Sequence, residues 1–234
     1  MIKEAIILAG GLGTRLRDAV PDLPKCMAPV NERPFIGYVI QHLKEQGIER
    51  FIFSLGYKHN YFNDYLLGEL NADQFELCIE EEPLGTGGAI QYAATFVKGE
   101  DVIVTNGDTL FNVNIATLGN QHLLNQSHCT LSLKPMNDFE RYGVVEIDEK
   151  ATIVSFKEKK YYKEGLINGG VYALNLATLL HKSLPPKFSF EKEYLEAYFT
   201  ERNFFATVQQ AYFIDIGIPE DYAKAAIDLS LIHI

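Results

Sequence analysis

The sequence predicts an α/β protein whose sheet is mixed but mainly parallel, with a small antiparallel sub-sheet. In the first half, apolar runs of strand length alternate with helical patterns, which implies right-handed βαβ units. After about residue 127, strand-like runs follow one another closely, which favours antiparallel pairing. The chain has 234 residues, of which 47% are apolar, so we expect one domain with one sizeable core.

The elements of the first half follow in chain order from hydrophobic spacing. Residues 2–8 form an apolar run typical of a buried strand. Residues 34–46 begin with a proline and place Phe35, Val39 and Leu43 on one helical face. Further strands are expected at residues 50–55, 75–79 and 101–105, and further helices at residues 59–70 and 87–97.

The second half is expected to extend the first without a linker or an internal repeat. Ligands on open parallel sheets bind outside the carboxyl ends of the strands. The turns after residues 8, 55, 79, 105 and 214 are therefore the expected ligand-binding positions. Strands of this half are expected at residues 129–134, 142–147, 152–156, 166–174 and 211–214, and helices at residues 176–182, 190–201 and 219–229.

Charge and cysteine content exclude several classes of function. The formal net charge of −10 argues against a nucleic-acid surface, which needs clustered Lys and Arg, but it permits a local cationic pocket. Cys26, Cys78 and Cys129 lie far apart without a CxxC pair, so neither a zinc site nor a disulfide framework is expected and a reducing cytoplasm fits. The N-terminus lacks the pattern of a signal peptide, and no apolar run approaches the ~20 residues of a membrane span.

The first turn, AGGLGTRLRDAVPDLPKCMAPV, combines flexibility with positive charge. Gly10, Gly11 and Gly13 allow backbone N–H groups to approach a ligand, and successive N–H groups suit phosphate oxygens. Arg15 adds a planar fork and Lys25 a point charge, both suited to phosphate. The spacing matches neither the Walker motif nor the dinucleotide fingerprint. The turn therefore predicts a phosphate site, with a plain tight turn as the alternative.

Two further turns each place an aspartate after an apolar strand. Asp108 follows the strand at residues 101–105 in TNGDTLF, and Asp215 follows the strand at residues 211–214 in YFIDIGIPEDY. A lone aspartate there is often only a turn former. Two of them can share a divalent ion, because Mg²⁺ prefers a few carboxylates together with substrate phosphates. With the cationic turn, they describe a nucleoside-triphosphate site that lacks a Walker motif.

The turn after the third strand reads EEEPLGTGGAI. Backbone amides and carbonyls of its GTGG run are placed to contact the edge of a base. A glycine-rich helix N-terminus with Thr86 as its N-cap accounts for the same motif equally well.

Taken together, the motifs resemble those of the sugar-1-phosphate nucleotidyltransferases. LAGGLGTRL followed by PKCMAPV is similar to the family signature GGxGTRL and PKxM. The motifs EPLGTGGA, NGDT, GVV, FKEK, INGGVY and FIDIGIPEDY then follow in the family order. They extend from the N-terminus to about residue 224, so the resemblance covers nearly the whole chain.

The resemblance implies a Rossmann-like nucleotidyltransferase core and an enzyme of nucleotide-sugar biosynthesis. In the family, a sugar 1-phosphate attacks the α-phosphate of an NTP, which releases pyrophosphate and gives an NDP-sugar. The implied cofactor is Mg²⁺ and the implied partners are the NTP and the sugar 1-phosphate, without nucleic acid or membrane; a homo-oligomer is compatible with the sequence. One nucleotidyltransferase domain is expected over residues 1–234, with a nucleotide-binding half at about 1–126 and a sugar-binding half at about 127–234.

The resemblance also assigns roles to matching residues. Arg15, Lys25 and Asp108 are expected to act in catalysis, with Lys25 on the α-phosphate and its transition state. Asp108 and Asp215 are expected to hold Mg²⁺. The expected nucleotide-binding residues are Leu8, Ala9, Gly10, Gly11, Gly13, Thr14, Arg15, Glu82, Gly85, Thr86, Gly87, Asn106 and Gly107. The expected sugar-phosphate-binding residues are Gly143, Glu158, Lys159, Asn168 and Gly169.

Within the family, the combination of GTGGAI, MNDFERYG, LINGGVY and FSFEKE resembles the bacterial D-glycero-D-manno-heptose 1-phosphate guanylyltransferases. The expected substrates are therefore GTP and this heptose phosphate, with Asn137, Arg141, Tyr161 and Lys163 expected near the end of the sugar. GTGGA is also close to the GTAGA loop of mannose-1-phosphate guanylyltransferases. A mannose- or glucose-1-phosphate enzyme that uses another NTP is thus the alternative.

Three other classes of protein share parts of this pattern. The first is a catalytically inactive regulatory homologue that binds a sugar nucleotide, but the presence of Arg15, Lys25, Asp108 and Asp215 favours an enzyme. The second is a glycosyltransferase, which would carry a DxD motif where this chain has GDT. The third is a molybdenum cofactor guanylyltransferase, which shares the glycine turn but not the sugar-side motifs.

Overall fold

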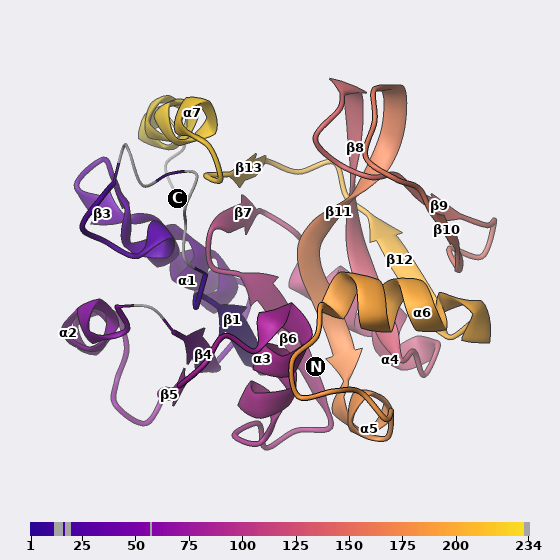
Figure 1. The fold of residues 1–234 in the computed structure, drawn as a ribbon, viewed down its shortest axis with the longest axis horizontal. Coiled ribbons are helices and arrows are strands. Elements are labelled where there is room, and N and C mark those ends of the chain that lie inside the picture. Colours follow the sequence, from indigo (N-terminus) through magenta and orange to yellow (C-terminus); the bar gives the residue numbers. More distant parts are fainter. Residues whose placement is uncertain (12–15, 17–19, 57, 232–234) are drawn as a thin grey trace.

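The computed structural model describes residues 1–11, 16, 20–56 and 58–231, which form a seven-stranded central sheet (Figure 1). The strand order is β12-β8-β11-β6-β1-β4-β5. Strand β1 pairs in parallel with β4 and β6, β4 with β5, and β12 with β8, whereas β11 runs antiparallel to both of its neighbours. The prediction of a mixed, mainly parallel sheet is confirmed. The strands are β1 (Glu4–Leu8), β4 (Arg50–Leu55), β5 (Phe75–Ile79), β6 (Asp101–Asn106), β8 (Cys129–Phe139), β11 (Tyr162–Asn175) and β12 (Phe204–Val208).

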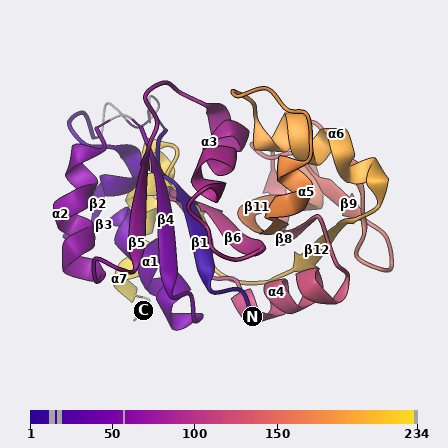
Figure 2. The same ribbon diagram turned by 90° about the horizontal axis from the view of Figure 1, so that it is seen from below.

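Helices cover both faces of the sheet. On β1, Ala5 and Ile7 pack against one set of helices, and Ile6 packs against the other. Burial on both faces explains why these strands are near-continuous apolar runs. The first face carries α1 (Phe35–Glu45), α2 (Asn60–Glu69), α4 (Ile115–Leu124) and α7 (Pro219–Leu231). The second carries α3 (Gly85–Ala94), α5 (Leu176–Leu180) and a helical segment made of the π-helical η2 (Phe190–Leu195), α6 (Glu196–Tyr198) and η3 (Phe199–Glu201) (Figure 2).

The antiparallel pairing predicted for the second half is confirmed between β8 and β11, but this pair belongs to the central sheet and not to the small sub-sheet. Ala173 of β11 pairs with Ile103 of β6 on one side and with Thr130 of β8 on the other. Close spacing of strand patterns indicates which strands pair, but it does not indicate which sheet they join. The small antiparallel sheet is formed instead by β9 (Val145–Ile147) and β10 (Ile153–Phe156).

Several elements were missing from the prediction, among them the helix α4 (Ile115–Leu124). The apolar pattern of α4 is interrupted by Gly119, and the helix is fixed by Asn114, whose side chain accepts a hydrogen bond from the backbone N–H of Thr117 at 2.8 Å. Strand β12 was also missed. The remaining additions are β7 (Thr109–Phe111), η1 (Lys25–Met27), β2 (Pro29–Val30) and β3 (Arg33–Pro34).

Strand β7 brings two distant parts of the chain together. It pairs antiparallel with β13 (Phe213–Asp215), so Asp215 lies opposite Thr109. The backbone N–H of Ile216 also donates to the carbonyl of Asp108 at 3.1 Å. This two-stranded ribbon joins the turn after β6 to the segment before α7 (Figure 1).

Candidate active site

Two cavities lie at the carboxyl edge of the parallel strands, and both are lined by Asn106 and Glu191. The larger has a volume of about 430 Å³ and the smaller a volume of about 210 Å³. The smaller cavity lies where β7, β11 and β13 approach each other. The larger cavity, at the carboxyl ends of β1, β4, β5 and β6, agrees with the rule that ligands bind outside the carboxyl ends of parallel strands.

The larger cavity is lined by most of the residues that were predicted to bind a nucleotide. Glu82 is exposed and does not line it, and Gly107 instead donates its N–H to the carbonyl of Leu8 at 2.8 Å. The predicted residues Gly13, Thr14 and Arg15 lie outside the described part of the chain. Predicted residues that line the cavity are Leu8, Ala9, Gly10, Gly11, Lys25, Gly85, Thr86, Asn106 and Asp108.

The smaller cavity collects the residues that were predicted on the sugar side. Gly143, Lys159, Asn168 and Gly169 line it together with Asp215, which comes from β13. Glu158 is exposed and does not line it. The four residues expected near the end of a heptose do not line it either. Arg141 forms an ion pair with Asp221, and Tyr161 donates to Asp138 at 2.8 Å.

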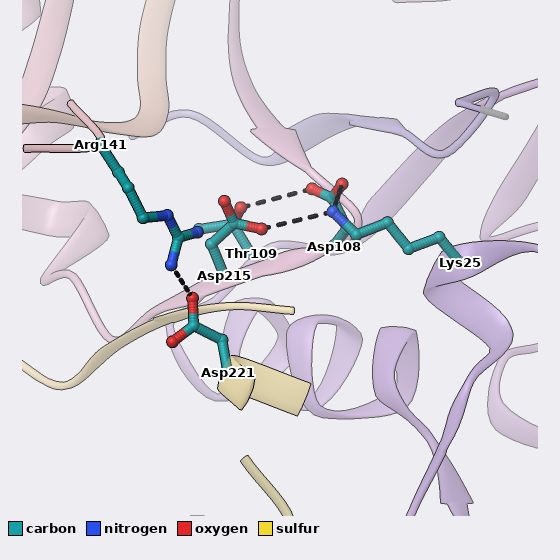
Figure 3. A network of polar contacts seen from close by, with 6 residues as sticks. All are labelled: Lys25, Asp108, Thr109, Arg141, Asp215 and Asp221. Atoms are coloured by element: carbon teal, nitrogen blue, oxygen red, sulfur yellow. Dashed lines mark hydrogen bonds and ion pairs between the residues drawn. The ribbon is translucent and has the colours of Figure 1, made fainter. Parts of the chain in front are cut away.

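The Lys25 side chain forms an ion pair with one carboxylate from each cavity. Its Nζ lies 2.5 Å from Asp108 Oδ2 and 3.3 Å from Asp215 Oδ1 (Figure 3). Asp108 lines the larger cavity and Asp215 the smaller. Burial alone would lower the pKa of the Lys25 ammonium, but the charges of the two carboxylates outweigh it and the pKa lies above its usual value. A fixed positive charge therefore stands at the boundary between the cavities.

Cys26 holds the Lys25 segment in place. Its thiol is buried and donates to the carbonyl of Ala9 at 3.7 Å, which ties η1 to the end of β1. Burial raises the pKa of this thiol to about 12, so it stays protonated and is a poor nucleophile at neutral pH. Its place beside the site is structural.

Asp108 and Asp215 fit the coordination of one Mg²⁺. Within the described residues, no group of three or more His, Cys, Asp or Glu side chains could hold a metal. Mg²⁺ does not need such a group, because it is commonly held by one or two carboxylates and completes its shell with water and substrate phosphates. Both aspartates face the same ammonium group, and their side chains keep 30% and 24% of their surface exposed.

The glycines of the GTGG turn make room for the segment that precedes η2. Gly85 has φ of +72°, which favours glycine. A Cβ on Gly87 would lie 2.0 Å from the ring of Phe188, which is itself buried. The N–H of Gly87 donates to the carbonyl of Phe188 at 2.9 Å. Gly87, predicted to bind nucleotide, is thus a packing position in this structure.

Gly87→Ala is expected to lower the free energy of unfolding by about 1–3 kcal/mol, because the added methyl group overpacks against Phe188. Gly68→Ala is the matched control, since Gly68 lies within helix α2 and an added Cβ there would meet no atom within 4 Å. Urea unfolding measures both variants. Equal stability of Gly87→Ala and the wild type would contradict the packing role.

Two carboxylates of the site were missed by sequence analysis. Glu80 lines the larger cavity and accepts hydrogen bonds from Ser54 Oγ at 2.9 Å and from the N–H of Leu84 at 3.0 Å. Its signal was its place directly after β5. Glu191 lines both cavities, and its signal was the FSFEKE motif.

The described part of the chain contains no helix that is long and apolar enough to cross a membrane.

Comparisons with known proteins identify the family. The profile of the family described as nucleotidyl transferase matches residues 4–230. The chain is 48% identical to D-glycero-alpha-D-manno-heptose 1-phosphate guanylyltransferase of Aneurinibacillus thermoaerophilus over 97% of this chain and 98% of the relative. It is 46% identical to the enzyme of that name from Campylobacter jejuni, over 94% of this chain and 96% of the relative.

Solved structures agree with the sequence relatives. The crystal structure of HddC from Yersinia pseudotuberculosis has a TM-score of 0.87 at 39% identity and covers 97% of this chain and 100% of its own. The structure of HddC complexed with GMP-PN has a TM-score of 0.86 at 38% identity over the same shares. With a family match over nearly its whole length and two full-length relatives above 45% identity, the chain belongs to the nucleotidyl transferase family.

Proposed function

We propose that the chain transfers a guanylyl group from GTP to D-glycero-D-manno-heptose 1-phosphate and releases pyrophosphate. The observation that carries this proposal is the Lys25 ammonium between Asp108 and Asp215, at the boundary of two adjoining cavities. Two substrates held in adjoining cavities meet at this charged boundary. The full-length relatives named as heptose 1-phosphate guanylyltransferases support the choice of substrates.

In the proposed reaction, a phosphate oxygen of the sugar 1-phosphate attacks the α-phosphorus of GTP. A P–O bond forms there while the bond to the bridging oxygen breaks, and pyrophosphate leaves with that electron pair. The phosphate oxygen is already a competent nucleophile, so the protein needs to supply position and charge. Lys25 stabilises the negative charge that builds on the α-phosphate oxygens.

Asp108 and Asp215 would hold Mg²⁺, which supplies charge neutralisation to phosphate oxygens when bound. Gly11, Gly13, Thr14 and Arg15 are proposed to hold the triphosphate, as the resemblance implies. On the sugar side, Glu158 and Lys159 are proposed to contact the sugar and its phosphate, and Asn168 and Gly169 to line the sugar.

We further propose that residues 1–234 form one domain. Its first half, about residues 1–126, mainly binds the nucleotide, and its second half, about residues 127–234, mainly binds the sugar 1-phosphate. The division is not strict, since Thr109 of the first half lines the smaller cavity and Glu191 of the second half lines the larger. Reaction in the cytoplasm is supported by three buried cysteines that are all free thiols.

The larger cavity offers a specific acceptor for guanine. The N1–H and exocyclic amino groups of guanine both donate hydrogen bonds, and a carboxylate accepts from both. Glu80 presents such a carboxylate, and its existing partners Ser54 and Leu84 each occupy a different oxygen, so lone pairs remain on both. Adenine, cytosine and uracil do not present this pair of neighbouring donors.

Glu80→Gln is expected to lower kcat/KM for GTP by about tenfold to a hundredfold, because one charged hydrogen bond to guanine is lost. The kcat/KM for ATP should change far less, so the ratio of kcat/KM for GTP to kcat/KM for ATP should fall. Glu81→Gln is the control, since Glu81 is exposed and does not line the cavity. An unchanged ratio of GTP to ATP rates would rule out Glu80 as the group that selects the base.

The reaction is tested by measuring pyrophosphate release with four NTPs against a panel of hexose and heptose 1-phosphates. We expect the highest kcat/KM with GTP and the heptose phosphate. A higher value with dTTP or UTP overturns the base assignment. If mannose 1-phosphate matches the heptose phosphate under GTP, the sugar assignment fails while the reaction class stands.

A further inference from the structure

Glu191 occupies a position that the reaction described above does not yet use. It lies on η2 and lines both the larger and the smaller cavity. The only other described residue that does so is Asn106, at the end of β6. A carboxylate at this boundary is within reach of ligands in both cavities.

One oxygen of Glu191 is fixed by the protein. Its Oε2 accepts hydrogen bonds from Thr86 Oγ1 at 2.7 Å and from Ser189 Oγ at 2.9 Å. Thr86 is held in turn, because its hydroxyl accepts from the backbone N–H of Phe190 at 2.8 Å. The packing of Gly87 against Phe188 fixes the same contact between the GTGG turn and the η2 segment.

The other oxygen, Oε1, receives no hydrogen bond from any residue that the structure describes. Thr86 lines the larger cavity but not the smaller. With Oε2 held on the Thr86 side, Oε1 is the oxygen left for a ligand on the sugar side. An ionised carboxylate only accepts hydrogen bonds and repels phosphate, so the ligand group it suits is a hydroxyl.

The neighbouring side chains of the smaller cavity suit a sugar ring as well. Asn168 donates from Nδ2 to the hydroxyl of Tyr172 at 2.9 Å, and both residues line this cavity with Glu191. Burial, and then the charge of Glu191, raise the pKa of Tyr172 far above its usual value, so its hydroxyl stays protonated. Amide, phenol and carboxylate groups together complement the hydroxyls of a carbohydrate.

We propose that Glu191 accepts a hydrogen bond from a ring hydroxyl of the sugar 1-phosphate and thereby selects the sugar. The proposal rests on the proposed function, since it assigns the smaller cavity to the sugar. Through Thr86, the same carboxylate links sugar binding to the turn that lines the nucleotide cavity.

Glu191→Gln tests this atom by atom. The donors Thr86 and Ser189 need an oxygen, so the amide oxygen of Gln takes the place of Oε2 and its NH₂ group takes the place of Oε1. The atom facing the sugar then changes from acceptor to donor. KM for the sugar 1-phosphate should rise about tenfold to a hundredfold, while the Kd of a non-hydrolysable GTP analogue, measured calorimetrically without sugar, stays unchanged.

Glu193→Gln is the matched control on the same helical segment. Glu193 is exposed, lines neither cavity, and accepts from the N–H of Ser189, so its loss should leave KM for both substrates unchanged. Thermal unfolding of both variants reports any general loss of structure.

Deoxy analogues of the sugar 1-phosphate identify the hydroxyl. With one analogue, the kcat/KM of the wild type should be about tenfold lower than with the full sugar 1-phosphate. The kcat/KM of Glu191→Gln should be the same with that analogue as with the full sugar, because the variant has already lost the hydrogen bond to the missing hydroxyl. An active wild type with an unchanged sugar KM in Glu191→Gln overturns the proposal alone. A raised Kd for the GTP analogue with an unchanged KM for the sugar 1-phosphate overturns the proposal and indicates that Glu191 contacts the ribose of the nucleotide instead. No pyrophosphate release by the wild type with any substrate pair overturns the proposed function and this proposal together.

Discussion

Lys25→Ala is expected to lower kcat by a factor on the order of 10²–10³, the usual effect of removing an electrostatic stabiliser of a transition state. The Lys25 ammonium stands between two carboxylates at the boundary of the cavities, where the proposed reaction builds charge on the α-phosphate. Because the carboxylates raise its pKa above the usual value, this charge is complete throughout the neutral range. The pH profile of the wild type should therefore show no loss of the Lys25 charge across the neutral range.

Steady-state kinetics and far-UV circular dichroism of the same preparation measure this prediction. Lys44→Ala is the control, since Lys44 is an exposed lysine on α1 that donates to the carbonyl of Glu69 at 3.0 Å. Folding should survive the loss of Lys25, because Asp108 and Asp215 retain enough exposure for water to solvate them. Turnover within a few-fold of the wild type in a folded Lys25→Ala would exclude the proposed role.

Strand positions in the first half were predictable because those strands are short runs rich in apolar residues between turn residues, and β1, β4 and β6 are largely buried. Strands β4 and β5 begin and end where the sequence predicted. Sheet membership in the second half was not predictable in the same way. The placement of β11 between β6 and β8 depends on pairing over long sequence distances, and periodicity carries no information about the partner of a strand.

The candidate site was predictable where its chemistry lies at or just beyond the end of a strand. Asp108, in the turn after β6, and Asp215, the last residue of β13, were both predicted in this way, and their approach follows from the β7–β13 pairing. Glu191 was not predictable in this way, because it reaches the site from a helical segment that packs on α3. Gly87 shows the opposite case, in which a glycine turn typical of ligand binding has a packing reason.

Asp108→Asn and Asp215→Asn should each raise the Mg²⁺ concentration for half-maximal rate by at least about tenfold, since even partners of metal ligands have effects of that size. If both aspartates bind the same ion, the shift in half-maximal Mg²⁺ concentration of the double variant should be smaller than the product of the two single fold-changes. Each substitution also removes one of the two carboxylate charges that hold the Lys25 ammonium in position. The loss in kcat should therefore exceed what saturating Mg²⁺ restores.

Mg²⁺ titrations of the rate separate this site from the role of Lys25. Lys25→Ala removes a competing cation from the two aspartates, so its half-maximal Mg²⁺ concentration should not rise, whereas both Asn variants shift upward. Asp228→Asn is the control. Asp228 lies on α7 and pairs with Lys224 and Tyr212, and none of these three residues lines either cavity. Unchanged titrations in both single variants would place the metal elsewhere. A strictly additive double variant would mean that the two carboxylates act on separate ions, and the Lys25 bridge between them would then be only a structural ion pair.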